Sequence, residues 1–337
     1  MSQGWRFISN LGLAVFVVAA ALEMAARCSV RADEEAEKPA APQPAPEPAE
    51  NPPPEKYTLA FKFRPNQVVR YDVAHDSEIF IHAKDDTETT RNTSQSKRHY
   101  KVIAVDEKTG AGDLELSIDW VHMVASFENG EGRKTEPIEF QSDDPTKHPE
   151  KFRQVLDSVG RPRATVRFGR TGNAIKVLAG AVAPTAPVQT PNGAPPAVDA
   201  LPESYFFLLP ENAVAIGDAW KERFDVFTRD EHKNLTKIAI QRKFWLTGVN
   251  EGRAVIEFKT VIITPVQDPA ISGQLIQREI SGKIVFDIER GLILSRESGV
   301  DRTVVNPFGA KSSMRAKSVY RETIAADEVD GADDRVE

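Results

Sequence analysis

Cysteine is almost absent from this chain of 337 residues. The single cysteine, Cys28, lies in the N-terminal segment that we expect to be removed on export. The mature chain would then have no disulfide, no thiol nucleophile and no cysteine ligand for a metal. A chain of this length can bury a core large enough to fold without disulfides, so we expect hydrophobic packing to hold it together.

Long hydrophobic runs are missing too. The apolar run at residues 11–22 is shorter than the about 20 residues that a membrane-spanning helix needs. It follows Arg6 and leads into small residues that end at Ala32, so we predict a secretory signal peptide over 1–32, cut between Ala32 and Asp33. We therefore expect an exported protein, periplasmic or extracellular, with no transmembrane span after cleavage. An uncleaved N-terminal anchor is the alternative.

The chain also lacks an excess of positive charge. Its formal net charge at pH 7 is −7, and removal of the predicted signal, which holds three arginines and one glutamate, changes it to −9. Nucleic acids and anionic membrane surfaces favour clusters of Lys and Arg. We therefore expect no nucleic acid partner.

Common catalytic and metal-binding motifs are missing: there is no G-x-S-x-G, no H-E-x-x-H and no G-x-x-x-x-G-K-[ST]. His75 and His82 would face opposite sides of one strand and could not share a metal. The neighbours Asp143 and Asp144 lie in a predicted loop, and adjacency does not place two carboxyls across a cleft. For His122 we expect a hydrogen-bonded residue rather than a base. We predict no catalytic residue, no cofactor and no metal.

Three segments are too poor in large apolar residues to fold. Residues 33–56 are almost entirely Pro, Ala and Glu, which predicts a disordered, extended tether. Residues 179–200 are rich in Ala and Pro and predict a linker, and residues 325–337 predict an acidic, disordered tail. This leaves two predicted folded parts, residues 57–178 and 201–324.

In both folded parts apolar and polar residues alternate, which is typical of antiparallel strands with one wet face. The clearest runs are 57–63 and 114–120, and strict alternation would place Trp120 on the same face as Leu114. Residues 149–160 predict one short helix that begins at a proline and ends at a glycine. Residues 205–209 predict a short helix or turn that packs on the core.

Two hairpins with similar sequences, residues 163–177 and 282–298, lie about 120 residues apart. Strands occur in a similar order around each, so we interpret the chain as a β-meander duplicated into two related halves. The predicted fold class is mainly β and antiparallel, with one or two short covering helices. The halves could be two β domains or one continuous curved sheet, a half-barrel.

Two motifs carry a resemblance to a known family. IGDAW at 216–220 and RFGRTGNAIKV at 167–177 resemble a family of exported, strand-rich bacterial proteins assigned to a domain of unknown function, over roughly residues 57–324. This resemblance implies export and β architecture, and it implies no known activity. At the level of the fold, the expected architecture is also similar to half-barrel carriers of lipoproteins or lipids.

Core packing is our main interpretation of the large aromatic residues. If the sheet curves without closing, however, some of them would line and cover an apolar trough for a ligand. The residues of this hypothetical trough are Trp120, Phe152, Leu156, Phe206, Phe207, Trp220, Phe258 and Phe286.

We therefore interpret the chain as a non-catalytic binding or scaffold protein of the cell envelope. The alternative is a carrier of a lipid or other apolar ligand, and an exported hydrolase comes third. The partner would be an envelope protein or an apolar ligand.

Overall fold

The computed structural model describes residues 54–130, 132–179, 205–229 and 234–326. The predicted signal peptide with its cleavage site at Ala32 and Asp33 lies outside these residues, as do most of the predicted tether, linker and acidic tail.

One antiparallel sheet of twelve strands dominates the described residues, so the predicted fold class, mainly β and antiparallel, is confirmed. The sheet consists of β2 (Val68–Ala83), β3 (Asp86–Val105), β4 (Gly112–Asn129), β5 (Ile138–Gln141), β6 (Pro162–Phe168), β7 (Ala174–Ala179), β9 (Ala219–Arg229), β10 (Leu235–Asn250), β11 (Arg253–Ile262), β12 (Ser281–Asp287), β13 (Leu292–Val305) and β14 (Ser312–Ile324).

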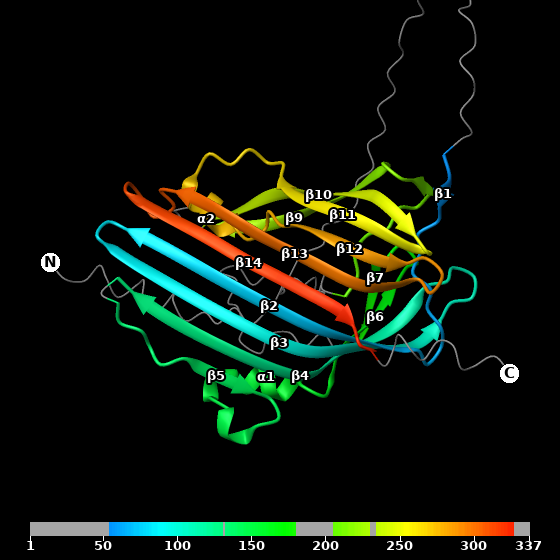
Figure 1. The fold of residues 1–337 in the computed structure, drawn as a ribbon, viewed down its shortest axis with the longest axis horizontal. Helices are drawn as coiled ribbons and strands as arrows, with labels where there is room; N and C mark the ends of the chain where they lie inside the picture. Colours follow the sequence, from blue (N-terminus) through cyan, green and yellow to red (C-terminus); the bar gives the residue numbers. More distant parts are fainter. Residues whose placement is uncertain (1–53, 131, 180–204, 230–233, 327–337) are drawn as a thin grey trace, which may run out of the picture.

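The sheet runs without a break from β7 at one edge to β9 at the other, in the order β7-β6-β4-β3-β2-β14-β13-β12-β11-β10-β9, and β5 adds to β4. The pairing of β2 with β14, for example Val73 with Glu322, joins strands from the two predicted halves. The described strands thus form one continuous sheet, which curves and stays open (Figure 1). The origin of its halves by duplication stays a prediction.

The remaining elements are short. β1 (Lys56–Tyr57) pairs with β8 (Val214–Ala215) in a separate two-stranded sheet. Two 3-10 turns, η1 (Pro145–Lys147) and η2 (Glu150–Phe152), lead into α1 (Arg153–Ser158), and α2 (Pro269–Leu275) follows β11. The helix expected at residues 149–160 is thus present as η2 and α1. α2 was not predicted, although Asp268 caps its N-terminus and Pro269 begins it.

The main apolar core lies where the curvature of the sheet brings strands from both of its ends together. Residues of β2, β3, β4 and β6 and residues of β10, β11, β12 and β13 belong to one cluster. Two segments without regular structure fill its centre: residues 59–63, which we call the strap, and residues 205–209. The Phe61 ring contacts the edges of Phe206 and Phe286, with ring centroids 4.8 and 5.3 Å apart.

The strap corrects one prediction. Residues 57–63 alternate as expected, and the strap residues Leu59, Phe61 and Phe63 are buried, but only Tyr57 of this run lies in a strand. The segment packs into the main core, where its side chains are buried although its backbone belongs to no β-ladder. Residues 205–209 form no helix, and their predicted packing on the core is confirmed.

The turns of the two similar hairpins bind the same strap. The carbonyl of Arg170, in the β6–β7 turn, accepts a hydrogen bond from the Phe61 amide at 2.8 Å. The carbonyl of Gly291, in the β12–β13 turn, accepts one from the Lys62 amide at 3.4 Å. Thr171 also accepts a hydrogen bond from the Leu209 amide at 2.8 Å. Both hairpins therefore hold the irregular segments of the core in place.

Two smaller apolar clusters lie on separate parts of the sheet. Ile271 and Leu275 of α2 pack on four residues of β9 and β10. Phe152 of η2 packs with Phe140 of β5 and with two residues of β4. Both clusters are distinct from the main core.

A β-bulge reverses the expected orientation of one tryptophan. On β3, Arg98 pairs with Ile118 and the preceding Lys97 pairs with Trp120, so Asp119 has no partner in the ladder. Beyond the bulge the buried residues of β4 change parity, beginning with Val121. We call the side of the sheet that faces the main core the inner face. The prediction that Trp120 shares the inner face with Leu114 is wrong.

The contact of a hairpin turn with the core predicts unequal effects at two similar glycines. Gly172 and Gly252 both have positive φ, 81° and 71°, so an alanine is strained at either position. A Cβ on Gly172 would also meet the Phe207 carbonyl and the Phe61 ring, whereas none of the described atoms lies within 4 Å of a Cβ on Gly252. We expect Gly172→Ala to lower the free energy of unfolding by about 1–3 kcal/mol more than Gly252→Ala, as measured in urea. Equal losses would contradict this account of the turn.

Candidate functional site

The inner face changes character along the strands. On β2, Val69 and Tyr71 belong to the main core, and every second residue after them lies on the same face. Next along the strands comes a row of polar residues, which we call the polar belt. The belt consists of Ser94, Ser96 and Arg98 on β3, His75 and Ser77 on β2, Ser318, Tyr320 and Glu322 on β14, and Arg296 and Ser298 on β13.

A buried ion cluster forms the part of the belt next to the core. Arg98 and Arg296 both pair with Glu322, the latter at 2.6 Å between Nη2 and Oε2. The three side chains are 6%, 10% and 0% exposed, in that order. Arg98 and Glu322 lie on strands that flank β2, so the cluster crosses the join between the two predicted halves.

Two tyrosines extend this cluster. The Arg98 guanidinium lies 4.4 Å from the centroid of the Tyr205 ring, and Arg296 donates a hydrogen bond to the Tyr320 hydroxyl at 3.1 Å. Burial raises the pKa of Tyr205 to about 12 and also raises the pKa of Tyr320, so both are neutral at pH 7. Burial alone would lower the pKa of each arginine, but the charge of Glu322 raises both.

A second ion pair continues the polar row on the second half of the sheet. Arg242 on β10 lies 3.6 Å from Glu222 on β9, and its Nε donates to the Thr260 hydroxyl at 3.2 Å. Burial raises the pKa of Glu222, although the charge of Arg242 opposes this shift.

Beyond the belt the inner face is mixed: Glu88 and Thr90 of β3 and Arg302 of β13 lie on it, together with several half-buried apolar residues. Ile79 and Ile81 of β2 continue the inner row, and β14 and β13 place Met314 and Val304 beside them. None of these four belongs to the three apolar clusters found among the described residues. This apolar patch lies farther from the main core than the belt does.

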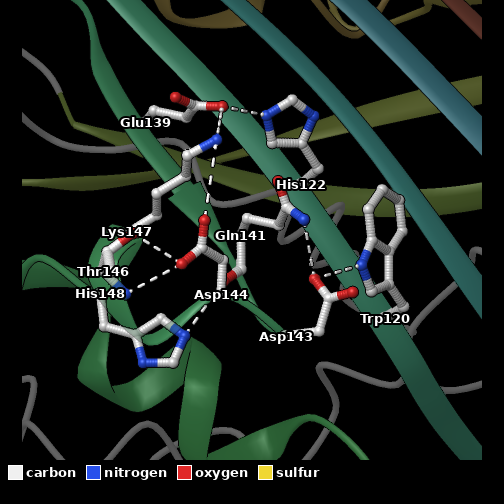
Figure 2. Close-up of polar contacts among 9 residues, drawn as sticks. All are labelled: Trp120, His122, Glu139, Gln141, Asp143, Asp144, Thr146, Lys147 and His148. Carbon is white, nitrogen blue, oxygen red and sulfur yellow. Dashed lines mark hydrogen bonds and ion pairs between the residues drawn. The ribbon is translucent and has the colours of Figure 1, made fainter.

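A separate polar cluster lies on the outer face, beside the bulge (Figure 2). Trp120 donates a hydrogen bond from Nε1 to Asp143 at 2.8 Å, and His122 bonds Glu139 through Nε2 at 2.8 Å. Lys147 donates to Glu139 at 2.9 Å, and this contact lowers the pKa of the carboxyl. The expectation that His122 is hydrogen-bonded is confirmed. These contacts tie η1 and the loop before it to β4 and β5.

The two adjacent carboxylates in this loop accept hydrogen bonds from different groups. Asp143 accepts hydrogen bonds from the Trp120 ring and from the side-chain amide of Gln141, whereas Asp144 caps η1 by accepting one from the backbone amide of Thr146 at 3.0 Å.

Within the ranges that the structure describes, no group of three or more His, Cys, Asp or Glu residues is placed to hold a metal ion. None of the helices in these ranges is long and apolar enough to cross a membrane.

The residues of the predicted trough lie in three places. Phe206, Phe207, Phe258 and Phe286 are buried in the main core, and Trp220 packs against it. Phe152 and Leu156 belong to the cluster around η2 and α1, and Trp120 is on the outer face, where it borders a shallow depression of about 410 Å³. The structure thus brings five of the eight together, as core residues.

Sequence reasoning missed the polar belt and the apolar patch beyond it. One signal was present in the sequence: Arg98 precedes Tyr100, and Glu322 precedes Ile324, each at the spacing of residues on one face of a strand. Charged side chains at these positions indicate a buried polar site within an otherwise apolar face.

The comparisons with known proteins identify no family for this chain. No protein-family model matches the chain, and no curated protein sequence matches it significantly. A solved structure described as "Lipid-protein interactions in lipovitellin" is similar, with a TM-score of 0.36 and 12% identity over 79% of this chain. The match spans about a quarter of the lipovitellin chain, 26%. The resemblance to exported bacterial proteins of unknown function stays a prediction.

Glu322 holds two buried positive charges, which predicts a large effect of its removal. Glu322→Gln leaves Arg98 and Arg296 without their shared counter-charge, and we expect a loss of about 3–5 kcal/mol in the free energy of unfolding. Glu297→Gln is the matched control, because Glu297 is 63% exposed and lies 3.6 Å from Arg321. We expect a change of at most about 0.5 kcal/mol there. Similar losses in urea unfolding would contradict the buried role of Glu322.

The position of His75 predicts a dependence of stability on pH. Burial lowers the pKa of His75 below its ordinary 6.5, with Asp76 opposing the shift, so the unfolded chain binds this proton more readily than the folded one. The stability that neutral His75 contributes to the folded state is fully present above pH 6.5, the ordinary pKa of histidine in the unfolded chain. It is lost as the pH falls from 6.5 towards the lower pKa of His75 in the folded chain. We expect His75→Asn to reduce the fall in Tm between about pH 7.5 and about pH 5.5. A fall of the same size in the variant and in the unaltered chain would refute the assignment.

Proposed function

We propose that this chain is a non-catalytic, exported binding protein of the cell envelope that carries an apolar or amphipathic ligand on its inner face. Export and the envelope location are inferred from the N-terminal sequence, with its predicted signal and tether. The observation that carries the ligand proposal is the half-buried apolar patch of Ile79, Ile81, Val304 and Met314.

The opposite face of the same strands supports this choice of surface. There the residues are charged and paired across strands, as Arg91 is with Glu78 at 2.6 Å and Arg315 with Asp301 at 2.7 Å. An antiparallel sheet normally keeps one face in water and buries the other. The outer face is therefore suited to water, and the inner face is the one on which a ligand gains most by excluding it.

The apolar patch also has a suitable shape and chemistry. It extends along neighbouring strands rather than forming a single spot, and this favours an elongated ligand. Met314 adds a flexible side chain that can adapt to ligands of different outline. Full burial of one aliphatic side chain contributes about 1.5–3 kcal/mol, so a few such contacts give useful affinity. The scaffold and hydrolase hypotheses stay predictions.

Ligand binding can be tested on the full chain purified from its native host. Native mass spectrometry with lipid extraction should find a stoichiometric apolar ligand, and the emptied protein should bind an apolar fluorescent dye. No bound ligand together with no change in dye fluorescence would refute the proposal.

Neighbouring residues of β2 provide matched variants for the same dye. Ile81→Ser changes the inner face and should weaken binding by about tenfold or more, because one buried aliphatic contact is lost. Phe80→Ser is the control: Phe80 lies on the outer face, 38% exposed, and its removal should leave the affinity unchanged. Urea unfolding of both variants separates lost binding from lost folding. A larger effect at Phe80 would assign the dye to the outer face.

A further inference from the structure

We propose that the edge strand β9 joins this chain to a second copy of itself, by antiparallel pairing of β9 with β9 of the second copy. The inference goes beyond the proposed function and does not depend on it. It is derived from the position of β9 in the sheet, the direction of its backbone groups and the charges along it.

Of the two edges of the sheet, β9 is the one suited to pairing. Among the described strands only β10 pairs with it, and all 11 residues of β9 belong to this ladder, with no shift in register. The opposite edge, β7, has 6 residues, and its ladder with β6 shifts register twice. Bulges of this kind interrupt a ladder and turn an edge away from further pairing. A long and regular edge such as β9 can accept another strand.

Gln274 of α2 shows which backbone groups of β9 face this edge. Its side-chain oxygen accepts a hydrogen bond from the Arg229 amide at 3.1 Å, and its nitrogen donates one to the Arg229 carbonyl at 2.7 Å. Both backbone groups of Arg229 therefore point away from β10, and those of every second residue before it do the same. Because Gln274 occupies the edge at Arg229, the stretch that can pair ends two residues earlier. The edge residues, as we call them, are Lys221, Arg223, Asp225 and Phe227.

The charges along β9 select one register. Edge residues can lie opposite only edge residues, so the two-fold axis between the copies must pass through a residue. With the axis at Phe224, Arg223 of each copy lies opposite Asp225 of the other. With the axis at Arg223 two arginines face each other, and with the axis at Asp225 two aspartates do. Axes one residue farther out place Lys221 opposite Arg223, or Arg223 opposite Arg229, and like charges directly opposite are destabilising.

Pairing in this register also suits the backbone and the remaining side chains. The four edge residues of each copy form four hydrogen-bonded pairs, and each pair exchanges two bonds, about eight in all. Asp225 already pairs with Lys237 of its own chain at 2.6 Å, and its carboxylate can accept a further bond from Arg223 of the second copy. Phe227, 51% exposed, would lie against the aliphatic part of Lys221 of the second copy.

Charged residues at a sheet edge often prevent pairing instead of supporting it. They do so when like charges meet in every register. On β9, however, Asp225 follows two positive residues, and one register brings only opposite charges together. The pattern of charge on this edge therefore favours pairing with itself.

Two charge variants test the register. Arg223→Asp and Asp225→Arg each place like charges opposite each other twice in the dimer. Either variant alone should therefore dimerise at least about tenfold more weakly than the unaltered chain, as measured by sedimentation equilibrium. A mixture of the two restores opposite charges and should form dimers again. Lys259→Asp is the control: this exposed residue of β11 changes the net charge as Arg223→Asp does, and dimerisation should stay the same.

The same experiment defines the results that would overturn the inference. These are a chain that stays monomeric at its highest soluble concentration, variants that dimerise as tightly as the unaltered chain, and a mixture that forms no dimers although urea unfolding shows both variants to be folded. Each of these results leaves the ligand proposal standing, because dye binding is measured separately.

Amide hydrogen exchange on the unaltered chain decides the question even if a variant fails to fold. Between low and high protein concentration, exchange at the edge residues should slow by about tenfold or more, because their N–H groups bond the second copy. Phe224 and Val226 are internal controls, since their N–H groups point to β10, and their exchange should change little. Exchange at the edge residues that does not depend on concentration would overturn the inference.

Discussion

The packing of the strap between two parts of one curved sheet is the interaction on which the rest of this structure depends. Phe61, from the first predicted half, contacts Phe286 of β12 and Phe206 and Phe207 of residues 205–209, all from the second. An open sheet has two free edges and no ladder that fixes its curvature. Here curvature is fixed by side chains and by two hairpin turns that bind the strap. The strap fills only one end of the inner face, and towards the other end Ile79, Ile81, Val304 and Met314 are half-buried.

The buried charges lie where this packing stops. A buried ion cluster adds little to stability compared with apolar residues of the same volume, because desolvation offsets its attraction. Its position is therefore informative: it separates a filled core from a half-buried apolar patch on the same strands. Along the strands the main core is followed by the buried charges and then by the apolar patch. The function that we propose rests on this change from charged to apolar surface, because an amphipathic molecule also has a polar and an apolar part.

Much of the fold was predictable because alternation is a local property. The alternation of apolar residues indicated antiparallel strands, and most of the chosen aromatic residues are core residues, as our main interpretation had it. The bulge at Asp119 was not predictable, since one additional residue reverses the face of Trp120 without a change in composition. The pairing of Arg98 with Glu322 has no local signal either, because the partners are 224 residues apart.

The pairing of β2 with β14 has a consequence for how the chain folds. These strands lie in the middle of the sheet, yet they are the first and last of its strands along the sequence. While a nascent chain lacks its final strand, each half exposes a long unpaired edge, the kind of surface on which chains aggregate. Completion of the sheet must wait for synthesis to reach residue 324, and pairing across so long a loop is intrinsically slow. A chain truncated before β14 would lack the centre of its sheet rather than an edge.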